Sequence, residues 1–287
     1  MAASAGTLHL GDCLEVLGRL APGSARLAYV DPPFNTGEVR RSERTRVVGD
    51  PEGPRVGFHG RRYRQEHSSG AAYGDRFDDY LGFLMPRLEA CLPVLAPDAS
   101  LFVHLDWREV HHVKVALDAL LGRERFLNEI VWAYDYGART RSRWPAKHDT
   151  ILWYALDPSA YVFDYEAMDR IPYMAPGLVT PEKAARGKTP TDVWWHTIVP
   201  TASKERTGWP GQKPLGILER IVKVHSEPGD LVLDFFAGSG TTGEAAARNG
   251  RRFALVDREP EACALMARRL AAWAPECVGF EPAATAG

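Results

Sequence analysis

The sequence predicts an α/β fold in which a mainly parallel sheet is covered by helices on both faces. Short apolar runs of strand length alternate with segments of helical spacing along most of the chain, as βαβ units require. Two of the apolar runs break directly into loops rich in Pro or Gly, at residues 31–37 and 235–240. With 287 residues and 45% hydrophobic content, the chain is long and apolar enough to bury a full core.

The predicted elements follow one another in a regular alternation. Leu27-Ala28-Tyr29-Val30 has the length and apolar character of a buried strand, and Tyr80, Leu84 and Leu88 have helical spacing. The same reasoning predicts strands at 27–30, 100–105, 129–134, 150–154, 231–234 and 253–257, and helices at 77–95, 110–121, 215–225, 241–249 and 260–273. The last four of these elements in chain order form a βαβα unit.

Two long segments lack this periodicity. Between residues 38 and 72 arginines are mixed with Gly, Ser and a few acids, which predicts a long, mobile, basic loop. Between 157 and 211 Pro, Lys, Arg and Trp become frequent, which indicates a separate target-recognition region. The chain is thus expected to consist of a catalytic part (1–156), this small region (157–211), a cofactor-binding part (212–274) and a frayed tail (275–287).

Composition and charge exclude several classes of protein. Lys and Arg number 35 against 37 Asp and Glu, so a nucleic-acid surface must be local. No apolar stretch reaches the length of a membrane span and the N-terminus lacks a signal-peptide pattern, which predicts a soluble, cytoplasmic protein without a membrane partner. The four cysteines are scattered without a CxxC pair, so neither a disulfide framework nor a metal site is expected.

A turn of small residues joins a strand to a helix near the end of the chain. In Asp234-Phe235-Phe236-Ala237-Gly238-Ser239-Gly240-Thr241-Thr242 the glycines allow the backbone to approach a ligand closely. The following helix N-terminus favours a carboxylate or phosphate, and Asp257 lies at the end of the next strand, where related folds bind ribose hydroxyls. Such turns serve NAD, FAD and S-adenosylmethionine alike, and some are purely structural.

The motif Asp31-Pro32-Pro33-Phe34 also follows a predicted strand. It supplies a carboxylate, a backbone carbonyl that a proline keeps out of the sheet ladder, and an aromatic face, which are three means of holding a flipped base. Hydrogen bonds from an exocyclic amino group to Asp31 and to the Pro32 carbonyl would free the nitrogen lone pair for attack on a methyl donor. The alternative is a purely structural role, in which the two prolines only end the strand.

Together these motifs resemble the amino-group DNA methyltransferases with circularly permuted motifs, the β class. In that class the catalytic motif precedes the cofactor motif, as it does here, and Gln212-Lys213-Pro214 resembles the motif that flanks the cofactor. The segment from Asn128 to Asp149 resembles the one that lines the base pocket, whereas Phe34 replaces a frequent Tyr and Pro210-Gly211 a frequent Thr or Ser. The resemblance implies a Rossmann-like methyltransferase fold, Asp31, Pro32, Pro33 and Phe34 as catalytic residues, and cofactor contacts from Asp12, Cys13, Asp31, Lys213, Asp234, Phe235, Phe236, Ala237, Gly238, Ser239, Gly240, Thr241, Thr242 and Asp257.

The resemblance also implies an activity. S-adenosylmethionine would donate a methyl group to the N6 of adenine in a specific site of double-stranded DNA, with base flipping, and cytosine N4 is the alternative acceptor. A homodimer and a cognate restriction endonuclease are further partners that the family admits in bacteria, where the enzyme would act at the nucleoid. DNA contacts are expected from Arg139, Arg141, Arg143, Lys147, His148, Trp194, Trp195 and Lys204.

Two rival interpretations remain at this point. A nucleotide-dependent oxidoreductase would use the Gly238-Ser239-Gly240 turn, but it leaves the Asp31-Pro32-Pro33-Phe34 motif without a role. A DNA-binding protein that has lost catalysis would not be expected to retain both motifs. Cytosine-C5 methylation is disfavoured, because its cysteine nucleophile typically follows a proline and none of the four cysteines does.

Overall fold

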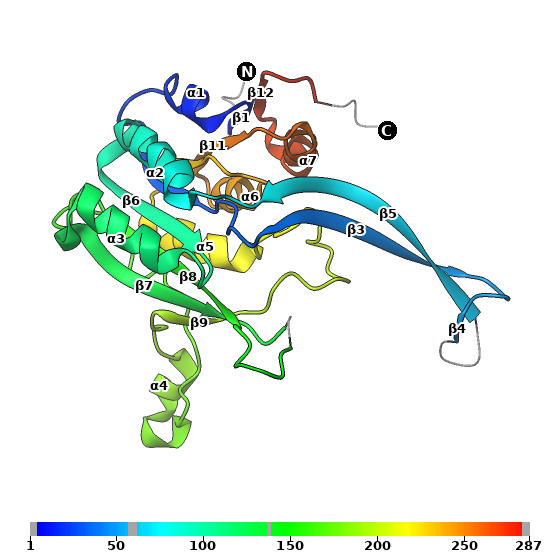
Figure 1. The fold of residues 1–287 in the computed structure, drawn as a ribbon. Helices are drawn as coiled ribbons and strands as arrows, with labels where there is room; N and C mark the ends of the chain where they lie inside the picture. The colour runs from blue at the N-terminus through cyan, green and yellow to red at the C-terminus, as the bar shows by residue number, and fades with distance from the viewer. Residues whose placement is uncertain (1–4, 57–61, 137–138, 283–287) are drawn as a thin grey trace.

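The centre of the protein is a nine-stranded sheet (Figure 1), seen in a computed structural model that describes residues 5–56, 62–136 and 139–282. The sheet has the order β12-β1-β11-β10-β2-β6-β8-β7-β9. Its strands are β1 (Gly6–Leu10), β2 (Ala25–Val30), β6 (Leu95–Leu105), β7 (Phe126–Ala133), β8 (His148–Ala155), β9 (Val193–Trp195), β10 (Leu231–Asp234), β11 (Arg252–Asp257) and β12 (Glu276–Val278).

The sheet is mainly parallel, as predicted. The neighbours from β12 through β1, β11, β10 and β2 to β6 all pair in parallel, and β9 pairs in parallel with β7. Only β8 runs antiparallel to its neighbours β6 and β7 among the described strands of this sheet. The carboxyl ends of β2 and β10 therefore lie side by side, at the edge where open α/β sheets bind ligands.

Helices cover both faces of this sheet. The first face carries α1 (Cys13–Leu17), α2 (Tyr80–Cys91) and α3 (Val110–Leu121), and the second carries α5 (Leu215–His225), α6 (Thr241–Arg248) and α7 (Pro260–Arg269). Side chains alternate along a strand, so Ala28 and Val30 of β2 pack with the first layer and Leu27 and Tyr29 with the second. This two-sided burial explains why residues 27–30 of the strand form an unbroken apolar run.

The regular elements agree with the sequence prediction except at their ends. Helices α3 and α5 and strand β10 have the predicted bounds, and the last predicted helix ends at Arg269 and continues as a 3-10 turn, Ala271–Trp273. Strand β1 and helix α1 are too short to show a period, and the prediction did not include them. The expectation of a frayed tail is wrong for residues 276–278, because β12 pairs with β1.

Residues 38–72 are largely a β-hairpin, so the expectation of a loop is wrong. Strand β3 (Glu38–Gly49) pairs antiparallel with β5 (Arg62–Asp75), and β4 (Arg55–Val56) pairs with β5 near the far end. The ribbon extends away from the main sheet and its helix layers (Figure 1). A strand outside the helix-covered sheet need not have the apolar pattern of a core strand, which is why the sequence carried no strand signal; residues 57–61, including Arg61, lie outside the described part.

The segment from 157 to 211 contains little regular structure. It includes a 3-10 turn at Pro176–Leu178 and the short helix α4 (Pro181–Arg186), and it returns to the main sheet at β9. The adjacent tryptophans of β9 face opposite ways: Trp194 is buried, whereas Trp195 is 72% exposed. Trp194 therefore packs mainly in the core, and of the two indoles expected to contact DNA Trp195 is the one on the surface.

Three further observations bear on function. Within the described ranges, no helix is long and apolar enough to cross a membrane. The same residues contain no group of three or more His, Cys, Asp or Glu side chains placed to hold a metal ion. Cys13, Cys91, Cys263 and Cys277 are all free thiols.

Helix α3 offers a matched test of the core. Leu117 is fully buried against the first face of the sheet, whereas Val115 on the same helix is 69% exposed. We expect Leu117→Ala to lower the free energy of unfolding by about 2–5 kcal/mol, because it removes buried methyl groups and leaves a cavity. Val115→Ala, the control, should change it by less than about 0.5 kcal/mol in urea titrations. Equal effects of the two substitutions would contradict this assignment of faces.

Candidate functional site

One cavity of about 920 Å³ opens at the carboxyl ends of β2 and β10. It joins the two motifs that the sequence singled out, although they lie at opposite ends of the chain. The four predicted catalytic residues line it, and so does each predicted cofactor residue except Gly240. The shared lining comprises Asp12, Cys13, Asp31, Pro32, Pro33, Phe34, Lys213, Asp234, Phe235, Phe236, Ala237, Gly238, Ser239, Thr241, Thr242 and Asp257.

The Gly-rich turn requires glycine at two positions. Gly238 has a φ of 48°, and a Cβ there would lie 2.8 Å from the Trp209 Nε1. Gly240 has a φ of 73°, and its Cβ would lie 2.9 Å from the Met266 Cγ. Gly240 therefore packs against α7 outside the cavity, and Gly238 keeps the backbone close to the cavity space.

Buried carboxylates surround this turn. Asp234 accepts hydrogen bonds from the Thr242 hydroxyl at 2.6 Å and from the Phe236 N–H at 3.0 Å, which tie the end of β10 to α6. Asp257 accepts from the Gly238 N–H at 2.8 Å and from the Glu259 N–H at 2.9 Å. Burial raises the pKa of Asp234 to about 7 and that of Asp257 to about 6. Burial thus makes both acids harder to ionise, and the internal hydrogen bonds partly offset this effect.

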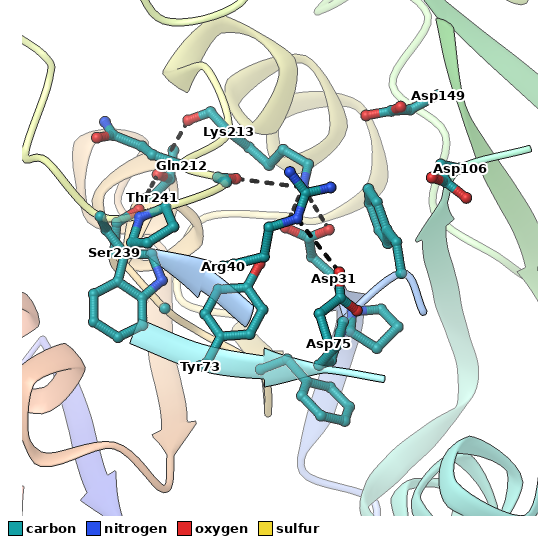
Figure 2. A pocket seen from close by; sticks show the side chains of 18 of the residues that line it. Asp31, Arg40, Tyr73, Asp75, Asp106, Asp149, Gln212, Lys213, Ser239 and Thr241 are labelled. Carbon is teal, nitrogen blue, oxygen red and sulfur yellow. Dashed lines mark hydrogen bonds and ion pairs between the residues drawn. The ribbon is translucent and has the colours of Figure 1, made fainter. Parts of the chain in front are cut away.

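Asp31 is paired with Lys213 across the cavity (Figure 2). The Lys213 Nζ lies 2.6 Å from both carboxylate oxygens, and it also lies 4.7 Å from the centre of the Phe34 ring. The ammonium group therefore covers both the acceptor and the aromatic face of the motif at once. Lys213 was expected to contact a cofactor; it lines the cavity, and its ammonium group also neutralises the carboxylate of the catalytic motif.

Residues far along the chain hold the Asp31-Pro32-Pro33-Phe34 loop in place. The buried Asp75, at the end of β5, accepts from the Asn35 N–H at 2.7 Å and the Thr36 hydroxyl at 2.5 Å. The Tyr80 hydroxyl donates to the Pro33 carbonyl at 2.6 Å. No hydrogen bond to the Pro32 carbonyl is found among the described residues, so this oxygen can accept one from a ligand.

A buried polar chain lies behind Phe34. The ring of Phe34 is 5.7 Å from that of His104, whose Nδ1 lies 2.5 Å from the Tyr29 hydroxyl. His104 Nε2 lies 3.2 Å from Asp149, which also accepts from the Tyr134 hydroxyl at 3.0 Å. Burial acts to raise the pKa of Asp149, but the hydrogen bond and charge of His104 outweigh it and the pKa is lowered. A fully bonded network of this kind fixes the position of the wall that Phe34 rests on.

The root of the hairpin closes the opposite side of the cavity. Tyr73 of β5 stacks on Trp209, with ring centres 6.4 Å apart and planes 17° from parallel. Arg40 of β3 forms an ion pair with Asp75 at 3.4 Å and reaches over the cavity toward Asp31 (Figure 2). Trp209 in turn lies against Gly238, so hairpin, catalytic loop and Gly-rich turn are in mutual contact.

Most of the residues expected to contact DNA lie outside the lining of the cavity, unlike the predicted catalytic and cofactor residues. Arg143 and His148 line the cavity, whereas Arg139, Arg141, Lys147, Trp195 and Lys204 lie outside its lining. Asp75, Tyr80 and His104 were not expected at the site. No local signal identifies them, since Asp75 is separated from Asn35 by 40 positions and acts only through the fold.

Comparison with known protein families and curated proteins gives matches. The profile described as DNA methylase matches residues 25–268, which is most of the chain. The type II methyltransferase M.HpaI of Haemophilus parainfluenzae is 29% identical over 234 residues. That alignment covers 82% of this chain and 64% of M.HpaI, so the chain spans a little less than two thirds of this relative.

Solved structures share the fold. The PvuII DNA methyltransferase (cytosine-N4-specific) superposes with a TM-score of 0.62 at 17% identity, covering 93% of this chain and 88% of the other. The M1.HpyAVI–SAM complex gives 0.58 at 19% identity, with 92% and 98% covered. TTHA0409 of Thermus thermophilus, complexed with S-adenosyl-L-methionine, gives 0.56 at 22% identity, with 96% and 99% covered.

Asp234 predicts a pH dependence of stability. Its pKa in the folded protein, about 7, exceeds its ordinary value of 3.8, so the folded state holds a proton between these values that the unfolded state has lost. The contribution of this group is therefore full below about pH 4 and decreases as the pH rises toward about 7, by at most about 4 kcal/mol. We expect the Asp234→Asn protein to show a smaller decrease in unfolding free energy than the unsubstituted protein over this range.

The measurement is a series of urea titrations between about pH 4 and pH 7.5, at which both proteins are compared at each pH. Asp78→Asn, an exchange at an exposed position, controls for the substitution itself. Parallel pH profiles of the Asp234→Asn and unsubstituted proteins would show that Asp234 does not titrate in this range.

Proposed function

The chain belongs to the DNA methylase family, and on that premise we propose that it transfers a methyl group from S-adenosylmethionine to the N6 of adenine in double-stranded DNA. One observation carries the proposal: a single cavity joins the Asp31-Pro32-Pro33-Phe34 motif to the Gly-rich turn after β10. A methyl transfer needs its donor and acceptor in contact, and this cavity can hold both. An oxidoreductase would leave the first motif without a role.

The residues around the turn fit S-adenosylmethionine. Gly238 lets the backbone of the turn lie against Trp209 in the cavity wall, and Asp257 lies at the end of the neighbouring strand, where ribose hydroxyls are bound in related folds. Asp257 lines the same cavity, where its carboxylate can accept hydrogen bonds from such hydroxyls. When bound, this cofactor supplies a methyl group on a positively charged sulfur, which is already activated for transfer.

The catalytic motif would hold the acceptor base. Asp31 and the Pro32 carbonyl can each accept one hydrogen bond from an exocyclic amino group, which leaves the nitrogen lone pair directed at the donor. Phe34 presents a face on which the base stacks, and His104 supports that ring from behind. The position of the cavity inside the protein requires the base to leave the duplex, as base-modifying enzymes generally require.

Lys213 occupies the place of the acceptor base before the base enters the cavity. Its ammonium group donates to Asp31 and lies over Phe34, which are the two contacts that the base needs. An entering base must therefore displace Lys213 from at least one of them. Until then, the ion pair compensates the charge of a partly buried carboxylate.

The choice between adenine and cytosine rests on position 31. In the β class an acid rather than Ser at this position is associated with adenine, which favours N6 of adenine here. PvuII, one of the structural neighbours, is a cytosine-N4-specific enzyme, so N4 of cytosine is the second candidate. We propose residues 157–211 and the exposed cations near the cavity as the surface that selects the DNA site.

The decisive experiment identifies the product. The purified protein is incubated with unmethylated DNA and labelled S-adenosylmethionine, and the nucleosides are analysed by mass spectrometry after nuclease digestion. N6-methyladenine supports the proposal, and N4-methylcytosine replaces it with the second candidate. Binding of S-adenosylmethionine without any methylated nucleoside contradicts a DNA methyltransferase activity, and binding of NAD instead supports the oxidoreductase.

Two substitutions should separate the catalytic from the cofactor contacts. We expect Asp31→Ala to lower kcat by at least about 100-fold while the affinity for S-adenosylmethionine stays nearly unchanged, because this carboxylate holds the base. Asp257→Ala should mainly weaken cofactor binding, through the lost ribose contacts. Calorimetry and single-turnover assays on both variants measure the two effects. Equal losses of both quantities in Asp31→Ala would contradict the division of roles, and normal affinity in Asp257→Ala would remove Asp257 from the cofactor site.

A further inference from the structure

Trp144 is an exposed indole at the rim of the cavity. It lies in the loop between β7 and β8, and 95% of its surface is accessible although it belongs to the cavity lining. Single exposed apolar side chains are common on protein surfaces, but this indole stands at the mouth of the cavity that is proposed to receive a base. Tyr134 directly follows β7 and Asp149 is the second residue of β8, and both line the same cavity.

The turn from Thr140 to Arg143, directly before this ring, is held by its own hydrogen bonds. The Thr140 hydroxyl accepts hydrogen bonds from the Ser142 and Arg143 N–H groups at 3.2 and 3.1 Å, and donates to the Arg143 carbonyl at 2.9 Å. Pro145 follows Trp144 and restricts the backbone on the other side. The indole is therefore presented from a defined turn.

A cation–π cluster attaches this turn to the main sheet. The Arg143 guanidinium lies 5.4 Å from the centre of the Trp107 ring, and the Arg108 guanidinium lies 4.9 Å from the same ring. Trp107 follows the end of β6, next to the strand that leads into the catalytic motif. The rim thus has a fixed position relative to Asp31, which a mobile surface loop would lack.

From these contacts we propose that Trp144 enters the DNA duplex at the place that the target base leaves, and stacks on the neighbouring bases. The inference rests on the proposed function, since only a flipped base leaves such a gap. The exposed Arg139, Arg141 and Arg143 on the same turn can bind the phosphates on either side. Apolar side chains that enter between bases are a general means of stabilising distorted DNA.

The position of the ring distinguishes this role from stacking on the base inside the pocket. A side chain with so little surface against the protein lies at the mouth of the cavity and not within it. Inside, the stacking face is that of Phe34, which rests on His104. Trp144 therefore acts on the duplex that remains, and the base itself is held by other residues.

The test compares matched DNA with DNA in which flipping is easy. We expect Trp144→Ala to lower kcat/KM by about 10- to 100-fold on a matched duplex, the equivalent of one lost stacking contact. On a duplex with the target base opposite an abasic site, the loss should shrink to about threefold or less, because the cost of extruding that base is already reduced. Both duplexes carry the methylation site mapped with the unsubstituted protein.

A second readout does not depend on turnover. With 2-aminopurine at the target position and no cofactor present, binding of the unsubstituted protein should raise the fluorescence as the base leaves the stack. Trp144→Ala should give a smaller rise at saturating protein, and Trp144→Phe should restore most of it. Trp195→Ala, which removes an exposed indole from β9 outside the cavity lining, is the matched control and should affect both duplexes equally.

The outcomes separate this inference from the proposed function. A Trp144→Ala loss of equal size on both duplexes would place the ring on the base or on phosphates and overturn the inference. Unchanged activity and fluorescence would overturn it too. In either case, methylation by the unsubstituted protein would leave the proposed function intact, whereas its absence with cofactor bound would contradict that function itself.

Discussion

The parallel pairing of β2 with β10 is the constraint on which the site depends. Leu27 pairs with Val232 and Ala28 with Leu233, so both strands end at the same edge of the sheet. That register brings Asp31 next to the Gly-rich turn. Asp31 also meets Lys213 there, although these two residues are 182 positions apart in the chain. Both strands are buried on their two faces, and a shift by one residue would exchange the side chains of the two helix layers. The packing of the core therefore sets the geometry of the site.

The same edge gathers charges that the fold has to compensate. Asp31, Asp234 and Asp257 repel one another, and burial raises the pKa of the latter two. Backbone N–H groups and the Thr242 hydroxyl satisfy the oxygens of these two acids, and Lys213 neutralises Asp31. Such a site is less stable than an apolar one of equal size, and functional sites commonly combine these features. This loss of stability is consistent with a cavity that receives a cationic donor and a base.

The hairpin connects this chemistry to the outer surface. Asp75 at its root holds Asn35 and Thr36, directly after the catalytic motif, and Asn35 has the left-handed φ of 57° that the turn requires. Tyr73 in the same strand stacks on Trp209, which lies against Gly238. The root of the hairpin is therefore tied to the loop after the catalytic motif and, through Trp209, to the Gly-rich turn. None of these links follows from residues that are neighbours in the chain.

The sequence by itself determined the α/β class, the bounds of α3, α5 and β10, and the two motifs of the cavity. These are local properties, since periodicity and turn chemistry act over a few residues. Tertiary contacts alone make β3 and β5 pair as a ribbon, bury Trp194 while Trp195 is exposed, and place Lys213 beside Asp31. They also place Asp75 and His104 where they support the catalytic loop. Each of these depends on strand order and packing between distant segments, which no local pattern of residues encodes.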